Sequence, residues 1–265
     1  MLDPDTFTSP ESYDVALLAA GAAIQAAAHA MKTGETAFAL VRPPGHHAER
    51  DKAMGFCLFN NVAVAAADAI AEGCERVAIV DIDVHHGNGT QWSFYDDPRV
   101  LYVSSHQYPF YPGTGAASET GRGAGAGLTV NIPLEAGATD ADFDLVYRSI
   151  AVPVLEQFAP QLTLISAGYD AHEADPLAAM RMSAAGYARM IARLRVAAQK
   201  TGALALATEG GYDLGALRGC LLATFEVLGA DIVNLIERET TTEPTRRGER
   251  ALAAVRAAQS AFWRL

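Results

Sequence analysis

An aspartate and a histidine stand two positions apart, directly after an apolar run, in the segment VDIDVHHGNGT at 80–90. Residues i and i+2 of an extended segment point the same way, so Asp83 and His85 can reach one metal ion. Asp170, in SAGYDAH, is our candidate for the third ligand. Two carboxylates and one imidazole with an open position are typical of catalytic zinc or ferrous iron. The alternative for a pattern this short is that Asp83 and His85 only cap the next helix.

General acid–base chemistry is offered by the adjacent pair His46 and His47 in GHHA. Two anionic ligands make a metal-activated water less acidic than three histidines would, so a separate base is useful. We expect one imidazole to be held by a buried carboxylate, with Asp81 as the candidate, while the other faces the water. Tyr212 follows two glycines in EGGYD, and its hydroxyl can donate to a developing oxyanion. Taken alone, a tyrosine in this place is more often only a turn residue.

The elements that must position these groups alternate between apolar strands and helices. Strands are predicted at 36–41, 76–82, 99–105, 128–132, 161–167 and 203–208. Helices are predicted at 11–31 (ending near Gly34), 61–73, 141–158 (kinked at Pro153), 183–200 and 214–229. This order predicts an α/β fold in three layers, αβα, with a mainly parallel sheet covered on both faces.

Four polar clusters follow predicted strands directly: RPPGHH, DVHHGNG, SAGYDAH and EGGYD. In an open α/β sheet, ligands bind in the crevice outside the carboxyl ends of the strands. We therefore expect these sequence-distant clusters to meet there. Aromatic residues in GFCLF and YPFYPGTG either line a narrow channel for a straight-chain substrate or pack in the core.

Composition limits the class of protein. The chain has 265 residues, half of them apolar, which predicts one domain over 1–265, with an exposed linker at 239–248 and a terminal helix at 249–265. A net charge of −11 argues against a nucleic-acid surface and favours cationic partners such as lysine-bearing peptides or polyamines.

Location is predicted from the cysteines and the apolar segments. Three cysteines without paired spacing indicate a reducing compartment, and we expect the protein to be cytoplasmic. The N-terminus lacks the regions of a signal peptide. Because Gln25 and His29 interrupt the apolar stretch 16–30, we expect a core helix there and no membrane span.

Six ordered motifs resemble the zinc-dependent histone deacetylase superfamily, from about Asp3 to about Leu228. They are RPPGHHAE, GFCLFNNVAVAA, VDIDVHHGNGTQ, YPGTG, SAGYDAH with ADPL, and EGGYDL. They look most like the class II branch and the bacterial deacetylase-like amidohydrolases. The resemblance implies the arginase–deacetylase fold. It also implies that one Zn²⁺ (Fe²⁺ is the alternative) is held by Asp83, His85 and Asp170.

The resemblance also implies the other roles. His47 would be the general base and then the acid, and His46 its electrostatic partner, held by Asp81. Tyr212 would polarise the amide carbonyl. Substrate contacts would come from the tunnel wall and the rim, through Asp5, Gly55, Phe56, Tyr111 and Leu177. Structural K⁺ ions would lie at two places, the first formed by Asp81, Asp83, His85, Ser104 and Ser105, and the second by Phe94, Asp97 and Val100.

Two departures from the family pattern stand out. Relatives carry a further segment before Asp3, including the first strand, so we expect this chain to be N-terminally short. Asn88 stands where class I relatives carry an aspartate behind the second histidine. A neutral partner favours the imidazolium less, so His47 is expected to stay unprotonated near neutral pH.

Three functions are open at this stage. The leading one is a metal-dependent amidohydrolase that removes acetyl or another acyl group from lysine side chains of a peptide or protein. The alternative enzyme function is hydrolysis of acetylated polyamines. A polyamine-specific relative has a glutamate at the position of Leu177, and leucine lacks that charge. Asp3, Asp5 or Glu49 are acids that could replace the glutamate. The alternative of another class is an inactive acyl-lysine or metal-binding module. The second-metal carboxylates of a ureohydrolase are not evident, and a homo-oligomer is left open.

Overall fold

A six-stranded sheet forms the centre of the computed structural model, which describes residues 2–230 and 243–265. The strands are β1 (Ala37–Ala39), β2 (Val77–Asp81), β3 (Val100–Gln107), β4 (Thr129–Leu134), β5 (Leu162–Ala167) and β6 (Ala203–Thr208). They lie in the order β1-β6-β5-β2-β3-β4, and every pairing is parallel. The prediction of an α/β fold is confirmed, and the sheet is parallel throughout the described residues.

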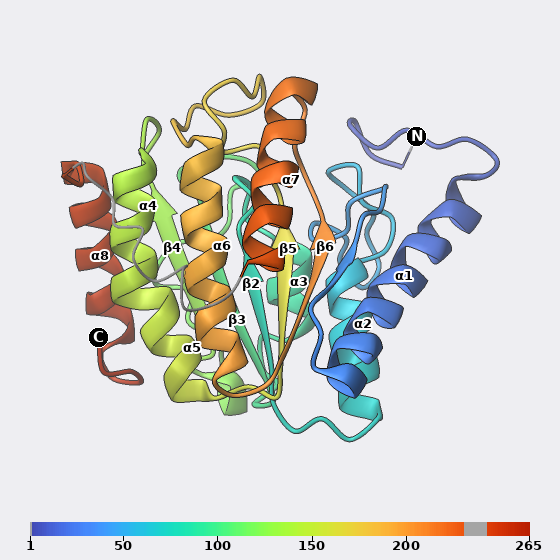
Figure 1. The fold of residues 1–265 in the computed structure, drawn as a ribbon, viewed down its shortest axis with the longest axis horizontal. Coiled ribbons are helices and arrows are strands. Elements are labelled where there is room, and N and C mark those ends of the chain that lie inside the picture. The colour runs from blue at the N-terminus through green and yellow to red at the C-terminus, as the bar shows by residue number, and fades with distance from the viewer. Residues whose placement is uncertain (1, 231–242) are drawn as a thin grey trace.

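Helices cover both faces of this sheet (Figure 1). One face is covered by α1 (Ser12–Thr33) and α2 (Asn61–Ala71). The other is covered by α4 (Asp140–Val146), α5 (Val152–Phe158), α6 (Ala184–Gln199), α7 (Leu214–Gly229) and α8 (Arg246–Gln259). The short helix α3 (Asn88–Ser93) follows β2. The result is the predicted three-layer αβα arrangement.

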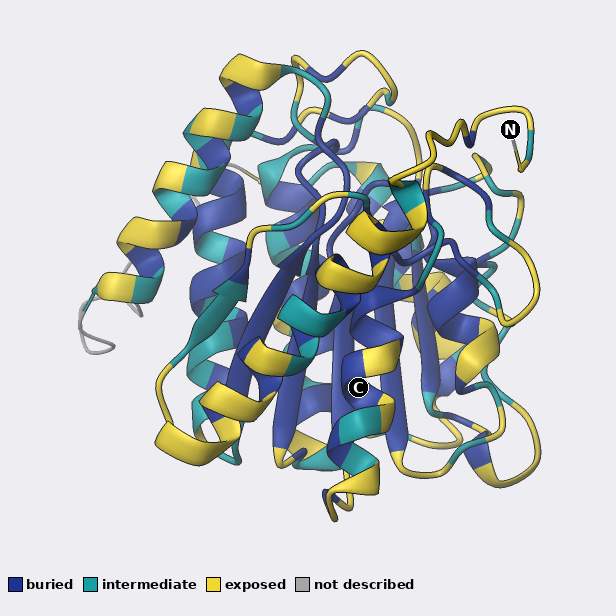
Figure 2. Cartoon of the chain, turned by 90° about the vertical axis from the view of Figure 1, so that its right-hand side faces the viewer, coloured by how far each residue is buried: buried dark blue, intermediate teal, exposed yellow. Residues whose placement is uncertain are grey.

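Each face of the sheet packs against its helices in a separate hydrophobic core. Alternate residues of the central strands point into one core or the other. In β2, Ala78 and Val80 belong to the cluster under α4 to α8, whereas Val77 and Ile79 belong to the cluster under α1 and α2. All four side chains are fully buried, and Figure 2 shows the strands as a buried layer between helices whose outer sides are exposed. A strand buried on both faces needs an unbroken apolar run, which is why the strands were recognisable in the sequence.

Alanines bring α1 close to the rest of the molecule. Seven alanines of α1 are buried, and the helix packs on α2, β1 and β6. Small side chains allow helices to approach closely, so little volume separates α1 from the alanine-rich face of α2. By length and composition, α1 is apolar enough to cross a membrane, but these contacts use its buried face within the fold. It ends where Gly34 adopts a left-handed conformation.

One predicted strand is shorter in the structure, and one predicted helix is interrupted. The strand predicted at 36–41 is paired only over Ala37–Ala39, because the Val41 N–H donates to the Thr208 hydroxyl (2.8 Å) and leaves the ladder. The helix predicted at 141–158 is interrupted by a π-helical turn at Tyr147–Ala151, and Pro153 lies in the first turn of α5. A proline lacks the N–H that would bond four residues back, so the chain widens just before it.

The linker predicted at 239–248 lies partly outside the described residues. In the described part, Arg246 to Gly248 already form the first turn of α8, and Gly248 is buried. The N-cap is Thr245, whose hydroxyl accepts from the Arg247 N–H at 3.1 Å. The terminal helix therefore begins three residues before the predicted start and ends at Gln259 instead of Leu265.

Candidate metal centre and active site

The polar clusters that follow β1, β2, β5 and β6 converge at the carboxyl edge of the sheet. They surround a cavity of about 240 Å³. Its lining comes from loops far apart in the sequence: Asp5, Pro44, His46, His47, Gly55, Phe56, His85, Phe110, Tyr111, Leu177, Gly210 and Tyr212. The convergence expected from strand polarity is therefore present in the structure.

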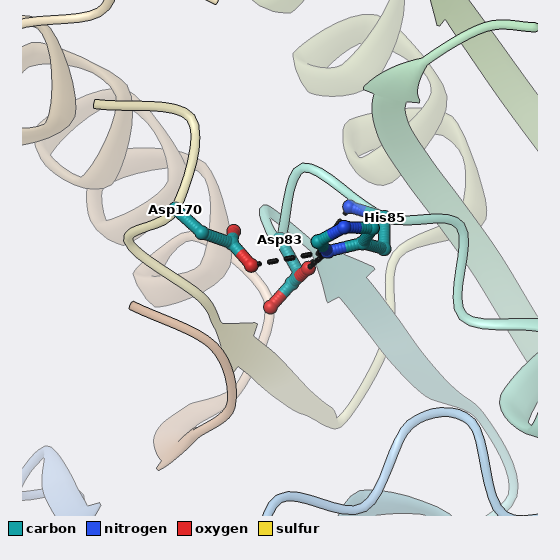
Figure 3. Close-up of side chains that lie close together, drawn as sticks. All are labelled: Asp83, His85 and Asp170. Atoms are coloured by element: carbon teal, nitrogen blue, oxygen red, sulfur yellow. Dashed lines mark hydrogen bonds and ion pairs between the residues drawn. The ribbon is translucent and has the colours of Figure 1, made fainter. Parts of the chain in front are cut away.

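Asp83, His85 and Asp170 form a compact cluster (Figure 3), and His85 lines the cavity. One ligand atom of each lies within 4.8 Å of the others, and both carboxylates are fully buried. His85 Nδ1 lies 3.2 Å from Asp83 Oδ1 and 3.1 Å from Asp170 Oδ2. Within the described residues, this is the one such group of His, Cys, Asp and Glu side chains.

The charges of this cluster fit a divalent cation. Burial opposes protonation of His85, yet its hydrogen bonds to Asp170 and Asp83 raise its pKa to about 10. Burial and the nearby Asp83 charge raise the pKa of Asp170 to about 6. The two carboxylates thus favour a positive charge beside them, which a bound metal ion would supply. The donor set suits Zn²⁺ or Fe²⁺.

Main-chain groups hold the two carboxylates in place. The Gly210 N–H donates to Asp83 Oδ2 (2.8 Å), and the Val84 N–H donates to Asp170 Oδ1 (2.9 Å). A Cβ atom on Gly210 would overlap both carboxylates, so only glycine permits this close approach. Such outer contacts would fix the orientation of the carboxylates as metal ligands.

His46 is held by the carboxylate predicted to hold it. Its Nδ1 lies 3.1 Å from Asp81 Oδ2, and both residues are buried. Burial disfavours the imidazolium, but the charges of Asp83 and Asp81 outweigh it and hold the pKa of His46 well above its ordinary value. The structure therefore favours a charged His46.

His47, in contrast, is held in its neutral form. Its Nδ1 lies 2.9 Å from the side-chain oxygen of Asn88 and so carries the proton, which leaves Nε2 without one. Burial, together with the charge of His46, holds the pKa of His47 well below its ordinary value. A neutral imidazole beside a cavity is the form that a general base needs.

Tyr212 lines the same cavity, and its backbone is anchored by a residue that the sequence analysis missed. The buried carboxylate of Asp175 accepts from the N–H groups of Tyr212 (2.7 Å) and Asp213 (3.3 Å) through one oxygen. Its other oxygen accepts from Leu177 (3.0 Å). Burial and the nearby Asp83 raise the pKa of Tyr212, so its hydroxyl remains a donor. The ADPL motif contains Asp175, but nothing in the pattern indicates its partners.

Glu209 is a second residue with an unpredicted place in the site. Its carboxylate accepts from the N–H groups of Gly45 (2.6 Å) and His46 (3.1 Å) and from the Ser166 hydroxyl (2.7 Å). Burial raises the pKa of Glu209 to about 7. The residue joins the end of β6 to the loop that carries both histidines.

Aromatic rings form the wall of the cavity. The Phe56 ring lies 5.8 Å from that of Tyr212, and the Tyr111 ring lies 5.1 Å from that of His47. Phe110, which the sequence analysis did not single out, stacks on His85 at 5.4 Å with an angle of 19°. Gly55 has a φ of 57°, and a Cβ there would overlap the His47 ring.

Of the four residues that the sequence analysis placed at or near the cavity rim, only two line the cavity. Asp5 and Leu177 line the cavity, whereas Asp3 and Glu49 are not among its lining residues. Asp3 accepts from the Asp5 N–H at 3.0 Å. Glu49 accepts from the side-chain amide of Asn88, so it does not replace a rim acid.

The residues of the first predicted potassium site lie along β2 and β3 and just after β2, and those of the second lie in the turn that leads into β3. Asp81 and Ser104 face one another in the β2–β3 register, and Ser105 follows. Phe94, Asp97 and Val100 share a turn in which the Asp97 N–H donates to Phe94 (3.1 Å) and the Val100 N–H to Asp97 (3.4 Å). Potassium binding stays a prediction.

Comparisons with known proteins agree with the geometry. The sequence model of the histone deacetylase domain matches residues 1–228. A probable deacetylase of Archaeoglobus fulgidus is 48% identical, over 82% of this chain and 62% of that protein. Histone deacetylase 15 of Arabidopsis thaliana is 42% identical, over 98% of this chain and 47% of that protein.

A solved structure is similar over almost the whole chain. The crystal structure of the HDA15 HD domain has a TM-score of 0.92 and 40% identity, and the match covers 99% of this chain and 72% of that one. This chain spans less than two thirds of the length of the two relatives named above. From the domain match and these identities, the chain belongs to the histone deacetylase family.

Proposed function

We propose that this protein is a zinc-dependent amidohydrolase that removes acetyl, or a related acyl group, from lysine side chains. The observation that carries the proposal is the Asp83–His85–Asp170 cluster, whose His85 lines one cavity together with a neutral His47 and Tyr212. Names of the relatives support deacetylation in general. The aromatic walls of the cavity favour a straight, apolar chain such as the lysine side chain.

Asp83, His85 and Asp170 would hold the metal. When bound, the ion would polarise the amide carbonyl and make a water more acidic. His47 Nε2 would take the proton of the attacking water and later deliver it to the leaving amine. The Tyr212 hydroxyl would donate to the carbonyl oxygen as negative charge develops on it.

The pH dependence of turnover should follow the residue behind His47. In Asn88→Asp, a carboxylate favours the imidazolium and raises the pKa of His47, roughly by one unit or more. The base works only when it is neutral, so the acid limb of the kcat/KM profile should move to higher pH. A pH–rate profile of wild type and variant measures this shift. An unmoved acid limb would show that His47 is not the group that limits activity at low pH.

Substrate choice should depend on Leu177, which lines the cavity and is 40% exposed. A leucine supplies no charge for the second ammonium of an acetylated polyamine. At ~4 Å a carboxylate attracts an ammonium by about 4 kcal/mol at an intermediate dielectric. We therefore expect wild type to prefer acetyl-lysine peptides in kcat/KM. Leu177→Glu should raise kcat/KM for N-acetylated spermidine or putrescine by about tenfold or more.

A side-by-side assay with an acetyl-lysine peptide and acetylpolyamines tests both statements. Leu177→Gln is the matched control, because it has the size of glutamate without the charge. If wild type already prefers acetylpolyamines and Leu177→Glu changes nothing, the polyamine alternative holds. Metal binding with no turnover of any acylated amine would favour the binding-module alternative.

We also propose that K⁺ occupies both predicted sites, one beside Asp81 and Ser104 and one in the turn from Phe94 to Val100, and that the protein works in the cytoplasm. The second proposal is supported by three free, buried cysteines, at positions 57, 74 and 220. Such thiols are typical of a reducing compartment.

A further inference from the structure

The half-buried carboxylate of Glu49 is the last member of a hydrogen-bond chain that begins at His47. His47 Nδ1 donates to Asn88 Oδ1 (2.9 Å), and Asn88 Nδ2 donates to Glu49 Oε1 (2.6 Å). His47 and Asn88 are buried, and Glu49 lies outside the cavity lining. Glu49 is thus two hydrogen bonds away from the ring that faces the cavity.

The orientation of the Asn88 amide decides which nitrogen of His47 carries the proton. With its oxygen toward His47, the amide requires an N–H at Nδ1 and leaves a lone pair on Nε2. If the amide were turned over, its NH₂ group would face Nδ1, and the proton of a neutral imidazole would move to Nε2. Nε2 takes part in no hydrogen bond among residues 2–230 and 243–265. Nε2 is therefore the atom that is free to accept a proton. A turned Asn88 amide would place a proton on it, and His47 could then no longer act as a base.

Three acceptors surround Asn88 Nδ2 and hold the amide in the productive orientation. Glu49 Oε1 lies at 2.6 Å, whereas the His47 carbonyl oxygen and Met54 Sδ both lie at 3.4 Å. The two longer contacts are weak, and only the carboxylate is charged. The amide orientation therefore depends mainly on Glu49.

We propose that Glu49 is a positioning residue that selects the Nδ1–H tautomer of His47 by fixing the Asn88 amide. The inference rests on the proposed function only in that it gives His47 the task of a base. The competing explanation is that the Glu49 side chain only stabilises its loop, in which the Glu49 N–H donates to the Lys52 carbonyl oxygen (2.9 Å). The two explanations predict different results for double variants.

Kinetics of Glu49→Ala, Glu49→Gln, Asn88→Asp and Glu49→Ala with Asn88→Asp separate them. Glu49→Ala should lower kcat by about tenfold with KM unchanged, because a charge-assisted hydrogen bond is lost. Glu49→Gln keeps an acceptor oxygen and should restore most of that loss. In the Asn88→Asp background there is no amide to orient, so Glu49→Ala should leave kcat equal or higher. Asp51→Ala, which removes an exposed acid of the same loop, controls for charge.

A spectroscopic measurement tests the tautomer without turnover. In ¹⁵N-histidine-labelled protein, the His47 ring signals, assigned by their absence in His47→Gln, should show a protonated Nδ1 and an unprotonated Nε2. Glu49→Ala should shift both toward the other tautomer. Unchanged ring signals, or an equal loss of kcat with and without Asn88→Asp, would overturn the proposal. A wild type that hydrolyses no acylated amine would instead count against the proposed function, while the ring signals would still decide the role of Glu49.

Discussion

Asp170→Asn is expected to lose metal and turnover together. The substitution removes one of the two carboxylate charges and leaves an amide, which is a poor zinc ligand. The loss of zinc affinity should exceed the roughly 10- to 100-fold that changes in outer contacts cost. Zinc content by elemental analysis and turnover of an acetyl-lysine peptide, measured on the same samples, check the prediction.

The fold should survive this change. Without a cation, Asp83 and Asp170 are two buried carboxylates close to one His85, and an amide relieves part of their repulsion. The melting temperature of metal-free Asp170→Asn should therefore equal or exceed that of metal-free wild type. Asp144→Asn, at the partly buried pair of Asp144 with Arg193 away from the cavity, is the control that should keep its zinc. Full zinc occupancy in Asp170→Asn would remove Asp170 from the ligand set.

Tyr212→Phe is expected to keep the metal and lose most of its turnover. Removal of one oxyanion donor typically lowers kcat by about a hundredfold or more. The ring contact with Phe56 and the backbone anchor on Asp175 do not need the hydroxyl, so the phenyl ring should stay in place. KM should change little, because the hydroxyl acts on the charge that develops during the reaction.

A second tyrosine of the cavity supplies the matched control. Tyr111 is 36% exposed at the rim, and Tyr111→Phe removes a hydroxyl from the wall instead of the reaction centre. It should keep kcat within a few fold. If Tyr212→Phe retained a kcat near that of wild type, the carbonyl oxygen would have to be stabilised by another donor.

The sequence predicted the layers and the meeting of the polar clusters because both follow from polarity along the chain. The helix predicted at 214–229 is observed as Leu214–Gly229, and its N-cap is the Asp213 of EGGYD. The polar residues at the strand ends meet because parallel strands share one edge. Such patterns are local, so they can be recognised without knowledge of tertiary contacts.

The partners of loop residues were not predictable in the same way. Glu49 was considered as an acid of the rim, yet it contacts Asn88, 39 positions away. Phe110 and Tyr111 are adjacent aromatics, and only the folded loop determines that the first one stacks on His85. A side chain in a loop is oriented by long-range contacts, and a single sequence gives no periodicity from which to infer them.

The hydrogen bonds that hold the Asp83 and Asp170 carboxylates bear on folding cooperativity. The Val84–Asp170 bond joins residues 86 positions apart, and the Gly210–Asp83 bond joins residues 127 apart. Contacts between residues so far apart in the sequence carry a large loop-closure cost, so we expect the ligand cluster to form only when β2, β5 and β6 have assembled. A cation that binds only the native state would then stabilise the whole domain, by about 4 kcal/mol at a thousandfold excess over its Kd. Chelation should accordingly lower one global melting transition, and hydrogen exchange should quicken across the central strands together with the loops.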